Sequence, residues 1–212
     1  MYVRKVKDRE LNFAVSGMLW KRSLIMVDQE TGSLWSHILG ECMDGELKGQ
    51  QIESLPALMT NWKTWREQYP KTTVLMMSRT SKNYQVEFYR DPSKFVLGMA
   101  LGERARAWPF DQLIKQPVVN DRFIKEPVAI FFDQESSTAL AFQRTLGDQE
   151  LTFQQKDGLL IDEQTGSIWD RTSGEAVSGP MKGKHLQPVV GIISYRRSWR
   201  DFHPETELWQ AE

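Results

Sequence analysis

Short apolar runs, each ended by turn residues, make up most of the chain. The runs "SLIMV" and "GLLI" both lead to an aspartate, Asp28 or Asp162, and a Thr-Gly-Ser sequence and a tryptophan follow each aspartate. An aspartate side chain can bond backbone amides two residues further on. Gly32 and Gly166 can supply the positive φ that a tight loop needs. Each place is therefore predicted to be a β-hairpin.

Most other apolar runs also predict strands. The stretch "KFVLGMALGERARAWPF" predicts a hairpin that turns at Leu101 and Gly102, and "FDQLIKQ" predicts a helical turn. Further strands are predicted in "QIESLPALM", "EPVAIFFDQESSTALAFQR", "QELTFQQ" and "HLQPVVGIIS". Two short helices, "NWKTWREQYP" and "YRRSWRDFHP", are stopped by Pro70 and Pro204. The predicted fold class is mainly β, a β-rich α+β protein with a few short helices.

The chain contains an internal duplication. At an offset of 134, residues 26–72 align with residues 160–206 without a gap, and fourteen of the 47 pairs are identical, where chance would give about three. A period this long excludes solenoid and propeller repeats, which recur every 20–50 residues. The identities include Asp28/Asp162, Trp35/Trp169, Glu41/Glu175, Gly45/Gly179, Lys48/Lys182 and Trp65/Trp199.

The duplication predicts two homologous units. Residues 1–90 would be an incomplete first unit and residues 91–212 the second, packed together as one globule. Each unit would be an antiparallel β unit closed by a short C-terminal helix. Shared packing about a pseudo-twofold axis is compatible with this organisation.

Composition and charge exclude several classes of protein. The chain has 27 basic and 28 acidic residues, which argues against a nucleic-acid binder. Its single cysteine, Cys42, excludes an internal disulfide and a multi-cysteine zinc site. The longest apolar runs are too short to span a bilayer, and the N-terminus lacks the apolar core of a signal peptide. As written, the chain is expected to be soluble, its compartment is not determined by the sequence, and it would be exported to the periplasm if an upstream signal has been lost.

Residues 95–209 resemble the bacterial family called domain of unknown function 3179. The resemblance is carried by "VLGMALGERARAWPF", "VVNDRF", "PVAIFF", "STALAF", "DEQTGSIW", "GEAVSGPMKGKHL" and "SWRDFHPET". Residues 11–80 are similar to the second half of another copy, through "LNFAVSGMLW", "DQETGSLWS", "GECMDGELKG" and "MMSRT". If the second unit begins near Lys94, the equivalent start of the first lies about 40 residues before Met1. We therefore expect that the first unit lacks its front half.

The resemblance implies no activity, because none is established for this family. Its members carry a C-P-L-C-like cysteine pair just before the T-A-L stretch, and many are exported. Here that place is "DQES", so Asp133 and Ser136 stand where the cysteines would be. If the cysteine pair is a redox or metal site, this unit has lost it.

The sequence lacks the usual catalytic and metal-binding motifs. His37, His185 and His203 have no H-x-x-H or H-E-x-x-H spacing, and a surface or capping role is the better interpretation. There is no G-x-S-x-G, and "GPMKGK" is one residue short of a P-loop. Cys42 is interpreted as a small buried thiol rather than a nucleophile. We predict no catalytic residue, no metal site and no cofactor.

Polar residues kept in both copies are the first candidates for a ligand site. Glu41 and Lys48 recur as Glu175 and Lys182. They could form a structural ion pair or support a turn within each unit. Alternatively, they could orient a ligand beside Trp35 or Trp169.

Other candidates occur once. Arg79 follows a predicted strand, and Asp133 and Ser136 lie in a loop after a predicted strand of apolar residues. The helix "YRRSWR" could bind an anion or a partner through its arginines, although a solvated helix face with Trp199 turned inward is the favoured interpretation.

The preferred functional hypothesis is a non-catalytic binding or scaffolding module, with an unknown small ligand or protein partner. The rival is a hydrolase-like enzyme with a carboxylate site at Asp133, Glu175 or their neighbours. A third hypothesis is a degenerate redox or metal domain that lost its cysteine pair.

Overall fold

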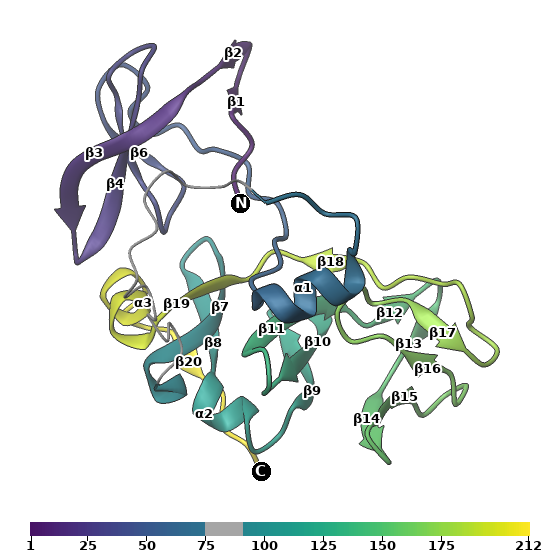
Figure 1. The fold of residues 1–212 in the computed structure, drawn as a ribbon. Helices are drawn as coiled ribbons and strands as arrows, with labels where there is room; N and C mark the ends of the chain where they lie inside the picture. Colours follow the sequence, from purple (N-terminus) through teal and green to yellow (C-terminus); the bar gives the residue numbers. More distant parts are fainter. Residues whose placement is uncertain (75–90) are drawn as a thin grey trace, which may run out of the picture.

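The computed structural model describes residues 1–74 and 91–212, and within them the chain is β-rich (Figure 1). Its strands form antiparallel sheets, with one parallel pair, and its helices are short. Two four-stranded sheets lie at opposite sides of the molecule, one near the N-terminus and one in the second half of the chain. The two sheets between them hold the largest hydrophobic core.

The N-terminal part begins with a small hairpin and continues into a four-stranded sheet of order β3-β4-β5-β6, followed by one helix. Its elements are β1 (Lys5–Val6), β2 (Arg9–Glu10), β3 (Phe13–Trp20), β4 (Ser23–Asp28), β5 (Leu34–Ser36), β6 (Cys42–Asp44) and α1 (Trp62–Gln68).

The central part contains two four-stranded sheets of order β19-β7-β8-β20 and β18-β11-β10-β9. Three of these strands come from the end of the chain: β18 (Pro188–Val189), β19 (Ile192–Tyr195) and β20 (Glu207–Leu208). The predicted hairpin at residues 94–110 is present, with its turn at Gly102 and Glu103. Its elements are η1 (Pro92–Lys94), β7 (Phe95–Leu101), β8 (Arg104–Pro109), α2 (Phe110–Leu113), β9 (Val118–Phe123), β10 (Glu126–Asp133) and β11 (Thr138–Gln143).

The C-terminal part repeats the N-terminal arrangement and then returns to the central sheets. A small hairpin precedes a four-stranded sheet of order β14-β15-β16-β17. Its elements are β12 (Thr145–Leu146), β13 (Gln149–Glu150), β14 (Phe153–Lys156), β15 (Leu159–Asp162), β16 (Ile168–Trp169), β17 (Ala176–Ser178), β18 (Pro188–Val189), β19 (Ile192–Tyr195), α3 (Arg196–Phe202) and β20 (Glu207–Leu208).

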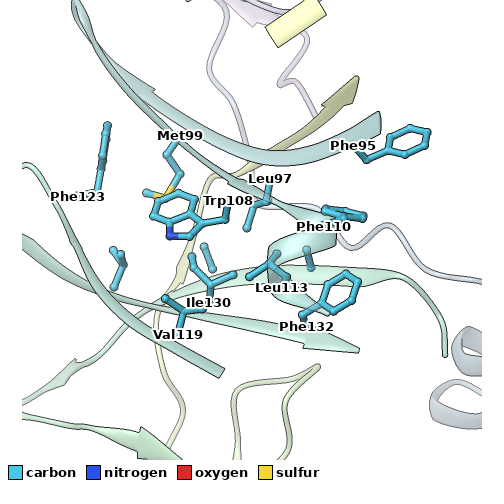
Figure 2. Close-up of a cluster of buried hydrophobic side chains, with 13 residues drawn as sticks. Phe95, Leu97, Met99, Trp108, Phe110, Leu113, Val119, Phe123, Ile130 and Phe132 are labelled. Atoms are coloured by element: carbon cyan, nitrogen blue, oxygen red, sulfur yellow. The ribbon is translucent and has the colours of Figure 1, made fainter. Parts of the chain in front are cut away.

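The main core lies between the β7–β8 hairpin and the β9–β10 hairpin. Figure 2 shows Trp108 and Leu97 from the first hairpin above Val119 and Ile130 from the second. Strand β10 carries the apolar run "VAIFF", whose side chains are buried on both faces of its sheet. One face packs in this core, and Phe131 on the other face packs against the β14–β17 sheet.

The repeated hydrogen bonds extend further than the gapless sequence alignment. The amide of Val3 donates to the Glu53 carbonyl at 2.9 Å, and the amide of Gln143 donates to the Gln187 carbonyl at 2.8 Å. The two donors, Val3 and Gln143, are 140 residues apart, whereas the two acceptors, Glu53 and Gln187, are 134 residues apart. The β3–β4 hairpin is therefore six residues longer than the β14–β15 hairpin, which ends the gapless match at this point.

The two helices at equivalent positions pack differently. In α3, Trp199 is fully buried against Val96, Ala105 and Ala107. Helix α1 buries none of its residues. The indole N–H donates to a threonine hydroxyl in both cases, from Trp65 to Thr72 at 3.1 Å and from Trp199 to Thr206 at 2.9 Å.

One predicted strand is wrong. Within "QIESLPALM", only isolated bridges form, at Gln51 and at Ser54. Ile52 is the only buried residue of this segment, and Leu55 and Met59 are exposed, so little of the segment packs against a core that could hold it in a sheet. Pro56 also removes a backbone donor from the segment.

Candidate functional site

Each repeated turn is organised around a buried aspartate. The Asp28 carboxylate accepts hydrogen bonds from the Trp35 indole at 2.8 Å and from the Thr31 amide at 2.6 Å. Asp162 accepts from the Trp169 indole and the Thr165 amide at the same two distances. Gly32 and Gly166 have φ of 69° and 70°, as the turn chemistry predicted.

This geometry gives Trp35 and Trp169 a structural position. Their exposed fractions are 0% and 3%, and their N–H groups are already bonded to the aspartates. Phe13 packs edge-on against Trp35 with ring centroids 5.6 Å apart, and Phe153 does so against Trp169 at 5.7 Å. A role of either tryptophan toward a ligand remains a prediction.

The repeated Glu and Lys residues lie in the loops that follow these turns. Of the ion pairs formed by the described residues, none joins Glu41 to Lys48 or Glu175 to Lys182. Their backbones have equivalent roles, since the Glu41 carbonyl accepts from Ser36 and the Glu175 carbonyl accepts from Asp170, both at 2.8 Å. These backbone contacts are compatible with turn support, and a role of the four side chains toward a ligand remains a prediction.

Glu41 also borders a cleft of about 570 Å³ that lies between the β5–β6 loop and β7. The lining includes Gln51 and Ser54 from the N-terminal part and Met99 and His203 from the remainder. Glu41 is thus one predicted site residue that borders a cavity.

Asp133 and Ser136 come together at the turn between β10 and β11. The Ser136 hydroxyl donates to the Asp133 carboxylate, and the Ser136 amide donates to the same oxygen at 3.1 Å. The chain of hydroxyls continues from Ser136 to Thr138 at 2.6 Å and from Thr138 to Thr60 at 2.9 Å. These hydrogen bonds connect the β10–β11 turn to the segment before α1, which is a structural role for Asp133 and Ser136. The remaining candidate, Arg79, lies outside the described residues.

A basic groove with a volume of about 860 Å³ lies beside α3. We call it the α3 groove. Its walls come from the β3–β4 hairpin, η1 and α3, three segments far apart in the sequence. It is lined by Arg22, Ser93, Lys94, Tyr195, Arg196, Arg197, Ser198, Arg200, Asp201 and Pro204.

The six extra residues of the β3–β4 hairpin hold it against the end of α3. Trp20 packs edge-on against Phe202 with ring centroids 4.9 Å apart. The Lys21 ammonium donates to the Asp201 carbonyl at 2.6 Å, and Arg22 forms an ion pair with the Asp201 carboxylate. The β14–β15 hairpin of the second copy is shorter and lacks these residues. The wall that the β3–β4 hairpin forms therefore has no equivalent in the second copy.

Carboxylate side chains already pair with three of the five cations in the groove. Arg22 pairs with Asp201, Lys94 with Asp91, and Arg196 with Asp111. Arg197 and Arg200 are exposed and pair with no carboxylate of the described residues. Among the described residues, the groove cations without a carboxylate partner are therefore these two guanidinium groups.

Shifts in pKa do not mark a general acid among the described carboxylates. Burial would raise the pKa of Asp28, but hydrogen bonds from Trp35 and Thr31 outweigh it, and the pKa is lowered. The Asn12 amide lowers the pKa of exposed Glu30, and Ser93 lowers that of Asp91. Downward shifts favour the ionised form, whereas a general acid at neutral pH needs a raised pKa.

The remaining titratable candidates also have structural environments. Burial lowers the pKa of His37 and of His203, and His203 is the C-cap residue of α3. Burial raises the pKa of the Cys42 thiol, which disfavours the reactive thiolate. Within residues 1–74 and 91–212, no three His, Cys, Asp or Glu side chains gather in a way that could hold a metal ion.

The sequence pointed to only one wall of the α3 groove. The arginines of "YRRSWR" were considered as an anion site, but a solvated face was preferred because the charge of the chain is balanced. Neither Arg22 nor Lys94 belongs to a sequence motif. Arg22 is held in the groove by its contact with Asp201, which lies 179 residues further along the chain. The length difference between the two hairpins is the signal that could have directed attention to Arg22.

Comparisons with known proteins agree with the duplication. The model of the family described as Protein of unknown function (DUF3179) matches the chain twice, over residues 1–93 and over residues 85–212. No curated protein and no solved structure matches. Among the described helices, none is both long and apolar enough to cross a bilayer. With both of its halves matched, the chain belongs to the DUF3179 family of proteins of unknown function, and it does so as a tandem.

Proposed function

We propose that the protein is a non-catalytic binding module and that its ligand lies in the α3 groove. The observation that carries this proposal is the groove itself, a cavity of about 860 Å³ built jointly by the two halves of the chain. A cavity of this size is in the range of small-molecule sites. The β3–β4 extension that closes one side has no counterpart in the second copy, which makes the groove a feature added to the repeated design.

The proposal includes the organisation of the chain. Residues 1–90 and 91–212 are two repeat units packed as one globule, and each unit ends with a short helix, α1 or α3. In support, the helices begin at equivalent positions, and each carries a tryptophan whose indole bonds a threonine seven residues on. The contact of Trp20 with Phe202 joins the two units directly beside the groove.

A hydrolase-like function has less support. Its candidate residue Asp133 is engaged by the hydroxyl and amide of Ser136. Glu175 lies in a loop, where its backbone pairs with His185. Neither carboxylate lines the α3 groove.

The test is a thermal-shift screen of the purified chain against a library of small metabolites, with product analysis of every hit. A ligand that binds only the folded state raises the melting temperature, by an amount that depends on its concentration over Kd. We expect at least one hit that is recovered unchanged. Consumption of the hit would favour the enzyme instead.

A matched pair of variants locates the ligand. Ser93→Trp fills the groove, whereas Ser173→Trp adds the same bulk at an exposed serine remote from it. Both serines are exposed, and each donates to a nearby aspartate, Asp91 or Asp170. We expect Ser93→Trp alone to abolish the shift. Equal loss or equal retention in both variants would contradict the groove as the site.

A further inference from the structure

The residues that line the α3 groove indicate the charge of its ligand, provided that the proposed function holds. Arg197 and Arg200 are three residues apart on α3, and residues at this spacing are neighbours on a helix surface. A guanidinium presents five N–H donors in a fixed planar fork. These two adjacent forks have no carboxylate partner among residues 1–74 and 91–212, so together they can bind an anion that has several oxygens.

A tetrahedral dianion matches these two arginines better than a carboxylate does. The group to be bound must compensate two positive charges and accept hydrogen bonds from two forks. A phosphate monoester carries nearly two negative charges at neutral pH and has three terminal oxygens. A carboxylate carries one charge and two oxygens, so it would satisfy only one fork.

The third feature is an aromatic wall. The Tyr195 ring lines the groove and is half exposed, with an exposed fraction of 50%. Its other side packs against Phe95, with ring centroids 4.7 Å apart, so the ring is held in place. A planar or apolar group attached to the phosphate could pack on the free side of this ring.

The same charges disfavour a nucleic acid. A polyanion needs a continuous row of free cations, but Asp201, Asp91 and Asp111 already compensate three of the five in the groove. We propose that the ligand is a phosphorylated small molecule, with Arg197 and Arg200 binding the phosphate and Tyr195 contacting the attached group.

Calorimetric titration of the whole chain tests this proposal with simple probes. The probes are inorganic phosphate, phenyl phosphate and sulfate, with acetate and benzyl alcohol as the monoanionic and neutral comparisons. We expect phosphate and sulfate to bind and phenyl phosphate to bind more tightly than phosphate. We expect the affinity to fall as the ionic strength rises. Equal binding of benzyl alcohol and phenyl phosphate would overturn the proposal, as would the absence of any phosphate or sulfate binding.

The chain offers a matched control for the arginines. At the offset of 134, Lys63 and Arg66 of α1 correspond to Arg197 and Arg200, and they lie away from the groove. We expect the double variant Arg197→Gln/Arg200→Gln to bind phenyl phosphate at least about tenfold more weakly, a change of about 1.4 kcal/mol. The variant Lys63→Gln/Arg66→Gln should bind as the parent does. Equal weakening in both pairs would mean a general charge effect and overturn the assignment.

The two proposals can fail separately. If neutral ligands bind and Ser93→Trp blocks them, the groove is a binding site but its ligand is not a phosphate. If the parent chain binds phenyl phosphate and neither Ser93→Trp nor Arg197→Gln/Arg200→Gln weakens it, the anion site lies elsewhere and both assignments to the groove are wrong. Circular dichroism of each variant checks that it is folded. The dependence of phosphate affinity on ionic strength is measured on the parent chain, so it does not rely on any variant being folded.

Discussion

The Trp35 indole donates to the Asp28 carboxylate at 2.8 Å, and 134 residues later the Trp169 indole donates to the Asp162 carboxylate at the same distance. Both aspartates are fully buried. A buried carboxylate needs hydrogen bonds to compensate for lost hydration, and the turn amides and the indole supply them. The repeated motif is therefore a structural unit that fixes the turn between two strands.

The first prediction concerns this contact. Asp28→Asn keeps an oxygen for the Thr31 amide but replaces the second acceptor by an NH₂ group that cannot accept from Trp35. The unpaired indole N–H should cost about 1–3 kcal/mol of unfolding free energy. Asp162→Asn should cost a similar amount, and the exposed Asp44→Asn should cost little. Urea unfolding checks all three, and a neutral effect of Asp28→Asn would contradict the role given to the carboxylate.

The lowered pKa of Asp28 predicts acid sensitivity. Because the folded pKa lies below the unfolded one, this group stabilises the fold at neutral pH, and the contribution is lost as the pH falls through the folded pKa. We expect the unfolding free energy of the parent chain to decrease below about pH 5 and that of Asp28→Asn to decrease less. Urea titrations between pH 7 and pH 3 provide the comparison. Parallel curves for the two proteins would exclude this carboxylate as a cause.

Two glycines allow the loop after β6 or β17 to approach a serine. A Cβ on Gly45 would lie 2.7 Å from the Ser33 Cα, and a Cβ on Gly179 would lie 2.7 Å from the Ser167 Cα. Both glycines also have positive φ, of 100° and 88°. Alanine at either position should cost more than the roughly 1 kcal/mol expected from backbone conformation alone.

Matched controls for these glycines exist in the same loops. Gly49 and Gly183 have φ of 80° and 81°, with open space where a Cβ would lie. Their alanine variants should show only the conformational cost. Thermal or urea unfolding of the four variants would refute the close-approach argument if all four lost the same stability.

Equivalent phenylalanines should differ in their contribution to stability. Phe153 is 2% exposed and packs against Phe131 of β10, with ring centroids 5.2 Å apart. Phe13 makes the equivalent contact with a tryptophan but is only half-buried. Phe153→Ala should therefore cost about 3–5 kcal/mol, and Phe13→Ala roughly half as much. Equal losses would show that the packing of β10 on β14–β17 adds no stability at this position.

Two arginines at equivalent positions of the repeats, Arg144 and Arg4, also differ in how deeply they are buried. The Arg144 side chain is 9% exposed and bonds the Leu151 carbonyl at 2.9 Å. The equivalent Arg4 side chain is 55% exposed and bonds Asn12 and Glu10. The sequence alone could not distinguish them, because the difference comes from β9, which contributes the Asp121 carbonyl beside Arg144.

The repeated turns and most strands can be predicted from local sequence. Asp28 contacts Thr31 and Trp35, which are three and seven residues away, so the local sequence is enough to specify these contacts. The family followed from the same motifs, and two matches confirm it. The alignment missed residues 2–15 because a hairpin of different length interrupted the constant offset.

The position of the cavity, and the pairing of the described charges that line it, depend on contacts between segments far apart in the sequence. Arg22 and Arg200 lie in the α3 groove because Trp20 packs on Phe202, a contact between residues 182 positions apart. Likewise, the arginines of α3 look alike in sequence, but Asp111 pairs with Arg196 and leaves Arg197 and Arg200 unpaired within the described chain. Such differences depend on which distant segments meet, and a local pattern of residues does not contain that information.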